Sequence, residues 1–328
     1  MSYLGKLEYF DPLYEILNSH VFPYVNNPVF HVMRMSKRVY KYTEEKTRTS
    51  IIGKFFQLDD PIYERIQRIK GEFDNLHKIR SYGLDSRPNY VARPITREER
   101  IGLALVEEYI HGKDLDHYIK MAAYNGGDYL LKEKLSHLAS FLFTLHKRTE
   151  LPYNVNIDSL ISYFYKILDK IQRQTLISDM EREAFIRLMY KWTNSGILNT
   201  GSVIAHGDAT PTNFIFTDSG DVVAIDLERL KAGDIAYDIG MVCGELKHSF
   251  LWRTGDFNIS EGFIRHFLKS YASHFPDSRR AFIDITRRNP FYMGMTELRI
   301  ARNDFLHWDY RKKLVYEAMQ CLRGGINF

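Results

Sequence analysis

The sequence contains very little cysteine. Among its 328 residues there are two, Cys243 and Cys321. At most one disulfide can form, and no Cys-x-x-Cys pair is present to bind zinc. This excludes a disulfide-stabilised secreted scaffold and a zinc-finger module, and it favours a reducing, cytoplasmic setting.

Long apolar runs and targeting signals are also missing. No apolar run reaches the roughly 18 residues that a membrane-spanning helix needs, so no membrane span is expected. The N-terminal residues MSYLGKLEYFDPLYEIL do not have the basic start and apolar run of a signal peptide. The composition therefore predicts a globular chain without a membrane-spanning segment.

Charge of one sign is not in excess. The chain has 45 Lys and Arg against 41 Asp and Glu, which gives a net charge of +4. This argues against a nucleic-acid partner, since such proteins present a dense basic stripe. Two basic clusters, SRRAFIDITRR and YRKK, are interpreted as solvated helix faces. With 45% hydrophobic residues the chain is long enough for two lobes, and its oligomeric state is not indicated.

The N-terminal third predicts a small antiparallel sheet with one helix. The segments VFHVMRMSKRVYKYTEE and RTSIIGKFFQ are rich in β-branched and aromatic residues, with a polar turn near Glu44 to Thr47. Apolar residues at 62, 66, 69, 73, 76 and 79 follow helical spacing, and Gly83 stops that helix. NYVARPI and RIGLALVEEYI predict two more strands. Thr96 and Glu99 imitate a capping box, but no helical periodicity follows them.

After HGKDL the pattern becomes mainly helical. Helices are predicted for LLKEKLSHLASFLFTLHKRT, SLISYFYKILDKIQRQ, SDMEREAFIRLMYKW with a Ser178–Glu181 capping box, DIAYDIGMVCGEL, ISEGFIRHFLKSYASHF, and residues 291 to the end. NFIFTDSGDVVAIDLE predicts a hairpin with its turn at Asp218 to Asp221. The predicted class is α+β, with a strand-rich lobe over residues 1–110 and a larger helical lobe over residues 111–328.

One stretch, VIAHGDATPTNFIFTDSGDVVAIDLERL, sets Asp208, Asn213 and Asp226 among apolar residues. Polar groups in such a run need partners or a ligand. A phosphoryl-transfer site needs a carboxylate for the attacking hydroxyl, oxygen ligands for Mg²⁺, and a cation on the nucleotide phosphates. Mg²⁺ prefers carboxylate and amide oxygens. Two aspartates and an asparagine therefore supply the first two requirements.

The motifs resemble a known family. HGDATPTN followed by AIDLE resembles the catalytic signature of the aminoglycoside phosphotransferase and choline kinase superfamily, which has the protein-kinase-like fold. AGDIAYDIG continues the match. SIIGKFF, GEFDNLHKI, LVEEYIHGKDL and LASFLFTLH resemble the lysine strand, the glutamate helix, the hinge and the helix before the catalytic loop. The motifs keep the family's order from about residue 30 to 245, and the last 80 or so residues match no motif.

This resemblance implies roles for individual residues. Asp208 is the expected catalytic base, and Asn213 and Asp226 are the expected Mg²⁺ ligands. Lys54 is expected to contact the phosphates of ATP, with Glu72 holding it by an ion pair. The resemblance also implies that backbone groups of Glu108 and Ile110 bond adenine. His206 is expected to brace the catalytic loop, and Asp238 is expected to accept hydrogen bonds from the backbone of that loop.

The sequence departs from the protein-kinase pattern at one turn. KYTEEKTRTS has no G-x-G-x-x-G and no glycine at all, which points away from a protein kinase. Several single residues keep two interpretations. Glu64 competes with Glu72, and Glu228 is either a third metal group or an ion-pair partner of Arg229 or Lys231. Asp218 and Asp221 are interpreted as turn residues.

The leading functional hypothesis is an ATP-dependent kinase for a hydroxyl of a small molecule, such as an amino alcohol, a sugar or an aminoglycoside-like compound. A nucleotide-binding pseudokinase scaffold is the alternative, and a metal-dependent hydrolase built on DLERLK is a third. The acceptor is not identified by the sequence. The C-terminal region carries both acids (Glu261, Glu297, Asp304, Asp309) and bases (Arg299, Arg302, Arg311), and aromatic residues able to cage an ammonium (Phe291, Tyr292, Trp308, Tyr310).

Overall fold

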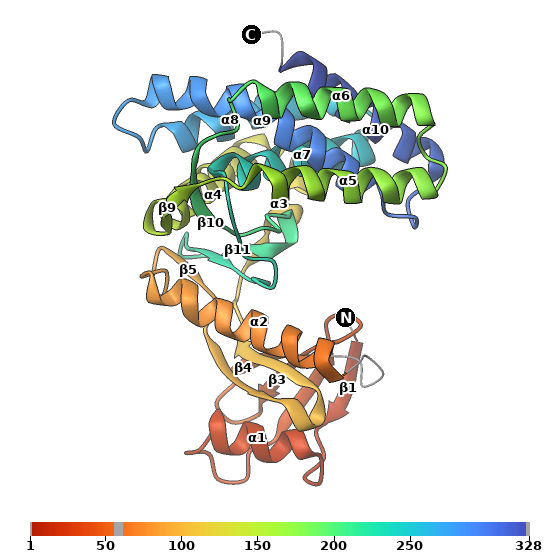
Figure 1. The fold of residues 1–328 in the computed structure, drawn as a ribbon. Helices are drawn as coiled ribbons and strands as arrows, with labels where there is room; N and C mark the ends of the chain where they lie inside the picture. Colours follow the sequence, from red (N-terminus) through yellow and green to blue (C-terminus); the bar gives the residue numbers. More distant parts are fainter. Residues whose placement is uncertain (1, 56–61, 326–328) are drawn as a thin grey trace. The chain divides into compact units, whose positions relative to one another are not determined.

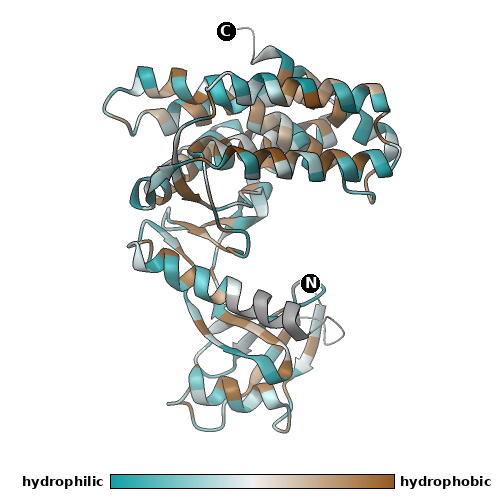
Figure 2. Cartoon of the chain, viewed as in Figure 1, coloured by the Kyte–Doolittle hydropathy of each residue, from teal (hydrophilic) through white to brown (hydrophobic). Residues whose placement is uncertain are grey.

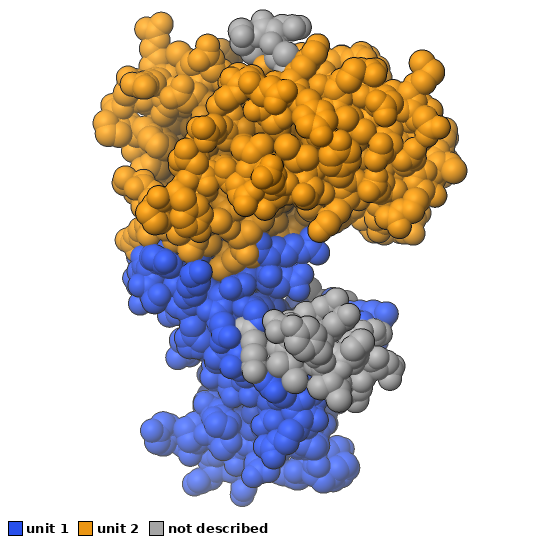
Figure 3. Space-filling view, viewed as in Figure 1, with its two compact units in different colours: residues 1–112, 217–229 blue, residues 113–216, 230–328 orange. Residues whose placement is uncertain are grey.

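A computed structural model describes residues 2–55 and 62–325, with the side chains of 62–70 left aside. The chain forms two compact units (Figure 3). The first comprises residues 1–112 and 217–229, and the second comprises residues 113–216 and 230–328. The short segment 217–229 therefore belongs to the N-terminal unit, although both its neighbours in the sequence belong to the other.

The first unit is built on a six-stranded sheet in the order β1-β2-β3-β4-β7-β6, with every pair antiparallel. The strands are β1 (Ser2–Lys6), β2 (Phe30–Arg34), β3 (Val39–Glu44), β4 (Ser50–Phe55), β6 (Pro94–Glu98) and β7 (Leu103–Glu108). The polar turn predicted near Glu44 to Thr47 separates β3 from β4, which pair antiparallel. Strand β7 lies between β4 and β6 and is buried along most of its length.

The prediction of one helix in this unit is wrong, because the described residues include a second one, α1 (Pro12–His20). The Asp11 carboxylate accepts a hydrogen bond of 2.9 Å from the Leu13 amide, and Pro12 occupies the first turn. Leu13 and Leu17 are buried in a cluster with Phe30. Nine residues give too little periodicity to detect this helix, so the cap was its main signal.

The predicted helix is α2 (Ile62–Ser81), which packs on β6 and β7. Its Asn75 Nδ2 donates to the Leu227 carbonyl at 2.8 Å, so α2 is fastened to the segment 217–229. In that segment β12 (Val222–Ala224) pairs in parallel with β5 (Asn89–Val91). The Thr96–Glu99 pattern leads only to a single 3₁₀ turn, Glu99–Ile101, so rejecting an α-helix there was right.

The second unit contains two small strand pairings. β8 (Lys113–Asp114) pairs with β11 (Phe214–Phe216). β10 (Gly201–Ala205) lies between β9 (Glu150–Asn154) and β13 (Lys231–Gly233), antiparallel to both. The register sets Lys231 opposite Ala205. The strand after AIDLE is therefore fixed beside the strand that leads into HGD.

Helices form the rest of this unit (Figure 1). They are α3 (Leu115–Asn125), α4 (Asp128–Arg148), α5 (Ile157–Arg173), α6 (Asp179–Asn194), α7 (Ile235–Thr254), α8 (Glu261–Ala272), α9 (Ser278–Ala301) and α10 (Trp308–Gly324). The predicted capping box of α6 is present. Hydrophobic and hydrophilic residues alternate around α5 (Figure 2), whose apolar face is buried.

Helix α7 is buried along most of its length and packs closely on α9. Gly240 and Gly244 make this approach possible. A Cβ at Gly240 would lie 2.4 Å from Cβ of Tyr292, and one at Gly244 would lie 2.8 Å from Cβ of Thr296. Since both distances are impossible for real side chains, glycine is required at each position for α9 to lie where it does.

The interpretation of the two basic clusters as solvated is wrong for one arginine in each. Arg288 is buried, with its Nε 2.8 Å from Asp234 Oδ2, and Arg311 is buried, with its Nε donating to the Ala301 carbonyl at 2.6 Å. Both link elements of the second unit. Cys243 and Cys321 are buried free thiols. Within residues 2–55 and 62–325, no helix is long and apolar enough to cross a membrane.

Candidate active site

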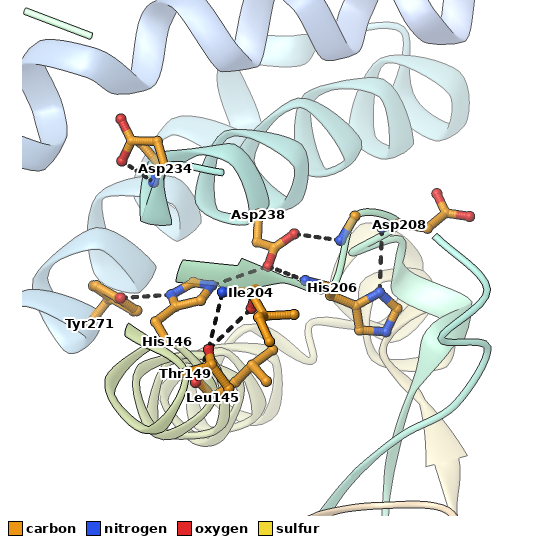
Figure 4. A network of polar contacts seen from close by, with 11 residues as sticks. Leu145, His146, Thr149, Ile204, His206, Asp208, Asp234, Asp238 and Tyr271 are labelled. Atoms are coloured by element: carbon orange, nitrogen blue, oxygen red, sulfur yellow. Dashed lines mark hydrogen bonds and ion pairs between the residues drawn. The ribbon is translucent and has the colours of Figure 1, made fainter. Parts of the chain in front are cut away.

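The loop after β10 is fixed by one carboxylate (Figure 4). Asp238, in the first turn of α7, accepts hydrogen bonds from the His206 amide at 2.7 Å and the Gly207 amide at 3.0 Å. Gly207 has φ +79°, a conformation that favours glycine. The His206 ring Nδ1 lies 3.3 Å from the Asp208 amide nitrogen. The backbone that carries Asp208 is therefore held in one geometry.

Asp238 is in turn held by α4. His146 Nε2 lies 3.1 Å from its Oδ2, and His146 Nδ1 lies 2.8 Å from the hydroxyl of Tyr271. Burial opposes the charge of Asp238, but the His146 hydrogen bond and the loop amides hold the pKa of its carboxyl below the usual value. Thr149 joins the same end of α4 to β10, since its hydroxyl accepts from the Ile204 amide at 3.2 Å.

Asn213 lies on the same loop, at the end of a 3₁₀ turn over Pro211–Asn213. Its Nδ2 donates to the Asp208 carbonyl at 2.9 Å. The amide nitrogen is thereby used within the loop, and the amide oxygen is the atom that suits a hard cation. The loop thus brings together the predicted catalytic carboxylate and one predicted metal ligand.

Arg299, near the end of α9, bridges two carboxylates and was not predicted to do so. Its Nη1 lies 2.7 Å from Asp208 Oδ1, and its Nη2 lies 2.8 Å from Glu245 Oε1 on α7. Burial opposes the charge of Arg299, but Glu245 and Asp208 outweigh burial and raise the pKa of the guanidinium. Burial raises the pKa of Glu245. A fixed positive charge therefore accompanies Asp208.

A cavity of about 450 Å³ adjoins this loop in the second unit. Its wall includes Thr210 and Thr212 of the loop, Glu245, Trp252 and Arg253. The acids around it are paired, because Glu245 binds Arg299 and Asp116 binds Arg253 and Lys120. The walls therefore carry little net charge.

In the first unit, Lys54 of β4 lies between two buried carboxylates. Its Nζ is 2.5 Å from Glu72 Oε1 and 3.2 Å from Glu107 Oε1. Burial opposes the charge of Lys54, but Glu107 and Glu72 raise the pKa of its ammonium. Burial raises the pKa of Glu72 to about 7 and also raises the pKa of Glu107. The sequence analysis did not identify Glu107 as a partner of Lys54. An acidic residue in the otherwise apolar strand LALVEE could have indicated it.

Asp226 follows β12 in the first unit with φ +62°, which is uncommon for a residue with a side chain. The backbone on both sides is fixed. The Ala92 amide donates to the Ala224 carbonyl at 3.0 Å, and Asn75 holds the Leu227 carbonyl. The carboxylate of Asp226 contributes to the electrostatic environment of Lys54, so the two groups belong to one charged cluster.

The hinge residues lie at the end of β7. The Glu108 amide donates to the Arg93 carbonyl at 3.1 Å, while its side chain accepts from the Arg93 amide at 2.8 Å. Its backbone amide is therefore already engaged. Ile110 is buried, two residues further on.

The remaining candidates have structural partners. Glu228 is exposed and lies 3.3 Å from Arg229. Asp221 closes its turn by accepting from Ser219 at 2.8 Å, and it also pairs with Arg87. Asp218 is exposed in the same turn. The side chain of Glu64, the rival of Glu72, lies outside the described residues.

The turn that lacks glycines is closed by a carboxylate. Buried Glu44 accepts a hydrogen bond from the Thr47 amide at 2.6 Å. Burial opposes its charge, but this amide and its neighbours lower the pKa of Glu44. An amide that already binds a carboxylate does not also bind a phosphate, so this turn is unlike a glycine-rich phosphate loop.

The donor set suits Mg²⁺ bound together with a nucleotide. Within the described side chains, no group of three His, Cys, Asp or Glu residues is arranged to hold a metal alone. An Asp and an Asn that share the ion with phosphate oxygens and water do not need such a group. Asn213 in the second unit and Asp226 in the first each carry an oxygen of the kind that a hard cation prefers.

Comparisons with known proteins identify the family and the fold of the chain. The model of the phosphotransferase enzyme family matches residues 34–282. A search of curated proteins found no significant match. Similar solved structures include an ethanolamine kinase from Plasmodium vivax, at 14% identity and TM-score 0.64 over 95% of this chain and 88% of that one.

Two further structures have comparable coverage. The choline kinase LicA from Streptococcus pneumoniae is 17% identical with TM-score 0.55, over 96% of this chain and 100% of that one. APH(2")-IIa, solved in a ternary complex with streptomycin and ATP, is 15% identical with TM-score 0.56, over 96% and 97%. These likenesses confirm the predicted protein-kinase-like fold.

Proposed function

The chain belongs to the phosphotransferase enzyme family and is a small-molecule phosphotransferase, and from this premise we propose that it moves the γ-phosphate of ATP to a hydroxyl of its acceptor. Asp208 takes the proton of that hydroxyl. The acceptor oxygen forms a bond to the γ-phosphorus while the bond from phosphorus to the bridging oxygen of ADP breaks. The products are the phosphorylated acceptor and ADP.

The observation that carries this proposal is the fixed loop around Asp208. Catalysis of phosphoryl transfer depends mainly on positioning and charge, so the carboxylate must already point correctly. Asp238 binds two successive amides before Asp208, and Asn213 binds its carbonyl. Hydrogen bonds from α7 and from the turn Pro211–Asn213 therefore hold the backbone on both sides of Asp208. Positioning of a reacting carboxylate requires such support.

The first unit supplies the proposed nucleotide contacts. Lys54 would bind the α- and β-phosphates, and Glu72 and Glu107 position its ammonium. Since the Glu108 amide is engaged by Arg93, its carbonyl would accept from adenine, and the Ile110 amide would donate. Asn213 and Asp226 would hold Mg²⁺, which supplies neutralisation of phosphate charge when bound. We propose a cytoplasmic location, consistent with free thiols.

The test is turnover with a matched pair of variants. Mg²⁺-ATP consumption is measured with a panel of amino alcohols, sugars and hydroxy acids for the wild type and Asp208→Asn. Loss of a general base should lower kcat by about 10³-fold while ATP still raises the melting temperature. The exposed turn variant Asp218→Asn is the control and should keep full activity. Equal rates for Asp208→Asn and wild type would reject the proposal.

A further inference from the structure

A second cavity in the helical unit contains a lysine without an acidic partner. The cavity has a volume of about 490 Å³, and its wall includes Lys231 of β13, Tyr163 and Ser159 of α5, and Tyr237 of α7. Lys231 Nζ lies 3.3 Å from the ring centre of Tyr237 and 5.0 Å from that of Tyr163. The ammonium therefore sits between two aromatic faces at the wall of an open space.

Charge around this lysine is incompletely balanced. Among the described side chains, Lys231 forms no ion pair, and the acids closest to it are engaged elsewhere. Asp238 binds the catalytic loop and His146, and Asp234 binds Arg288. Cation–π contacts compensate for part of the lost hydration, but less than a carboxylate does. Burial lowers the pKa of Lys231 to about 8, with Arg299 adding to the effect.

The cavity is also close to the catalytic loop. In the β10–β13 ladder Lys231 is paired with Ala205, three residues before Asp208. Arg299, which binds Asp208, contributes to the electrostatic environment of Lys231 and of Tyr237. Lys231 and Asp208 therefore share one neighbouring charge, the Arg299 guanidinium.

We propose that the Lys231 ammonium in this cavity binds a carboxylate, and that this carboxylate belongs to the phosphate acceptor. The acceptor is then a hydroxy acid. A single cation on the wall matches a singly charged carboxylate better than a phosphate dianion. Ser159 and Tyr163 on the same wall carry neutral hydroxyls of the kind that a carboxylate uses. The carboxylate of Asp234, which also lines the cavity, is paired with Arg288. The identification of the acceptor as a hydroxy acid rests on the kinase function proposed above.

The Arg299 bridge supports this choice of acceptor. Glu245 and Asp208 would attract a cationic acceptor if they were unpaired, but Arg299 already lies between them. A bound amine would meet this guanidinium as a like charge, whereas a carboxylate would not. Both observations therefore favour an anionic acceptor over an amine.

Binding is tested first, without ATP. Affinities of 2-, 3- and 4-hydroxycarboxylates, of their amides and of inorganic phosphate are measured by NMR titration of the full chain. We expect each bound acid to exceed its amide by about tenfold, as for a hydrogen bond to a charged group. Lys231→Met should remove this preference, Lys231→Arg should restore it, and exposed Lys313→Met should leave it unchanged. Melting temperatures verify folding.

Equal affinity for acids and amides, unchanged binding in Lys231→Met, no binding of any acid, or a preference for phosphate would overturn the carboxylate site. Turnover is tested second, with the same acids and amides and Mg²⁺-ATP. Phosphorylation of neutral or amine acceptors alone would leave the kinase proposal intact and reject the hydroxy acid. Binding of acids without any ATP consumption by the panel would leave the site intact and count against the kinase proposal.

Discussion

Arg299 donates from Nη1 to the Asp208 carboxylate at 2.7 Å, across 91 residues of sequence. The contact exists because α9 approaches α7 closely enough for one guanidinium to reach Asp208 and Glu245 together. The proposed catalytic carboxylate therefore lies next to a permanent cation. Under the proposed function the acceptor lies beside that ion pair, so Arg299 restricts the charge that the acceptor can carry.

Removal of Arg299 should destabilise the second unit through Glu245. Arg299→Met leaves buried Glu245 without its partner, and breaking such a pair costs about 3–5 kcal/mol of unfolding free energy. The double variant Arg299→Met/Glu245→Met should recover most of this loss, because no unpaired charge remains. Urea unfolding of both variants measures the difference. Additive losses in the double variant would contradict the pairing.

Asp238 should act as a positioning residue. In Asp238→Asn one loop amide faces an NH₂ group instead of a carboxylate oxygen, so the backbone at His206 and Gly207 shifts. We expect kcat to fall by about a hundredfold, with the KM for ATP nearly unchanged. Steady-state kinetics and the amide NMR shift of Gly207 are the measurements. A parallel rise in the KM for ATP would contradict a role confined to positioning Asp208.

Substitution of Glu107 and substitution of Lys54 should have different effects on stability. Glu107→Gln leaves the Lys54–Glu72 pair and removes the surplus carboxylate, so stability should change by less than about 1 kcal/mol. Lys54→Met leaves two unpaired buried carboxylates and should cost about 3–5 kcal/mol. Denaturant titration compares the variants, and an equal loss in both would be inconsistent with a shared lysine.

The same cluster predicts a pH dependence of stability. The folded pKa of Glu72, about 7, exceeds the ordinary value of 4.5, so between these values the folded chain binds more protons than the unfolded chain. The contribution of this cluster to stability should therefore fall as pH rises from 4.5 to about 7. Glu107→Gln should flatten that decline, and unfolding at both pH limits measures it. An unchanged slope would exclude coupling between the two acids.

Carboxylate binding at Lys231 should depend on pH in a defined direction. The ammonium is charged below its pKa of about 8, so affinity should be constant at lower pH and fall as pH rises above about 8. Tyr163, Tyr237, Asp238 and Arg299 face or surround this lysine, and burial keeps the pKa of Tyr237 high enough for its phenol to stay neutral here. In Lys231→Arg the NMR-measured affinity should stay flat. A decline in that variant too would assign the titration to another group.

The catalytic loop was predictable because its residues are close in sequence. HGDATPTN fixes Asp208 and Asn213 five residues apart, and the support from His206 and Asp238 follows from a motif of fixed spacing. The helix of Glu72 was located by helical spacing and the strand of Lys54 by its β-branched and aromatic residues, while the roles of the two side chains followed from the family resemblance. Local order along the chain was sufficient for these elements.

Contacts between distant helices were not predictable in this way. Whether Arg288 and Arg311 are solvated or buried depends on which helix packs over them, and helical periodicity does not report that. For the same reason the ion pairs of Arg299 were not predicted. They form only because two glycines in α7 allow α9 to pack closely against it. The contact of Glu107 with Lys54 could not be predicted without knowing that β7 pairs with β4, the strand that carries Lys54.

The assignment of residues 217–229 to the N-terminal unit has a consequence for biosynthesis. The chain passes from one unit to the other three times, after residues 112, 216 and 229. When a ribosome has delivered residues 1–112, strand β5 still lacks β12, and Asn75 still lacks the Leu227 carbonyl. The N-terminal unit therefore reaches its final structure only after more than one hundred further residues have been synthesised, and every contiguous fragment that contains it also contains residues 113–216 of the other unit.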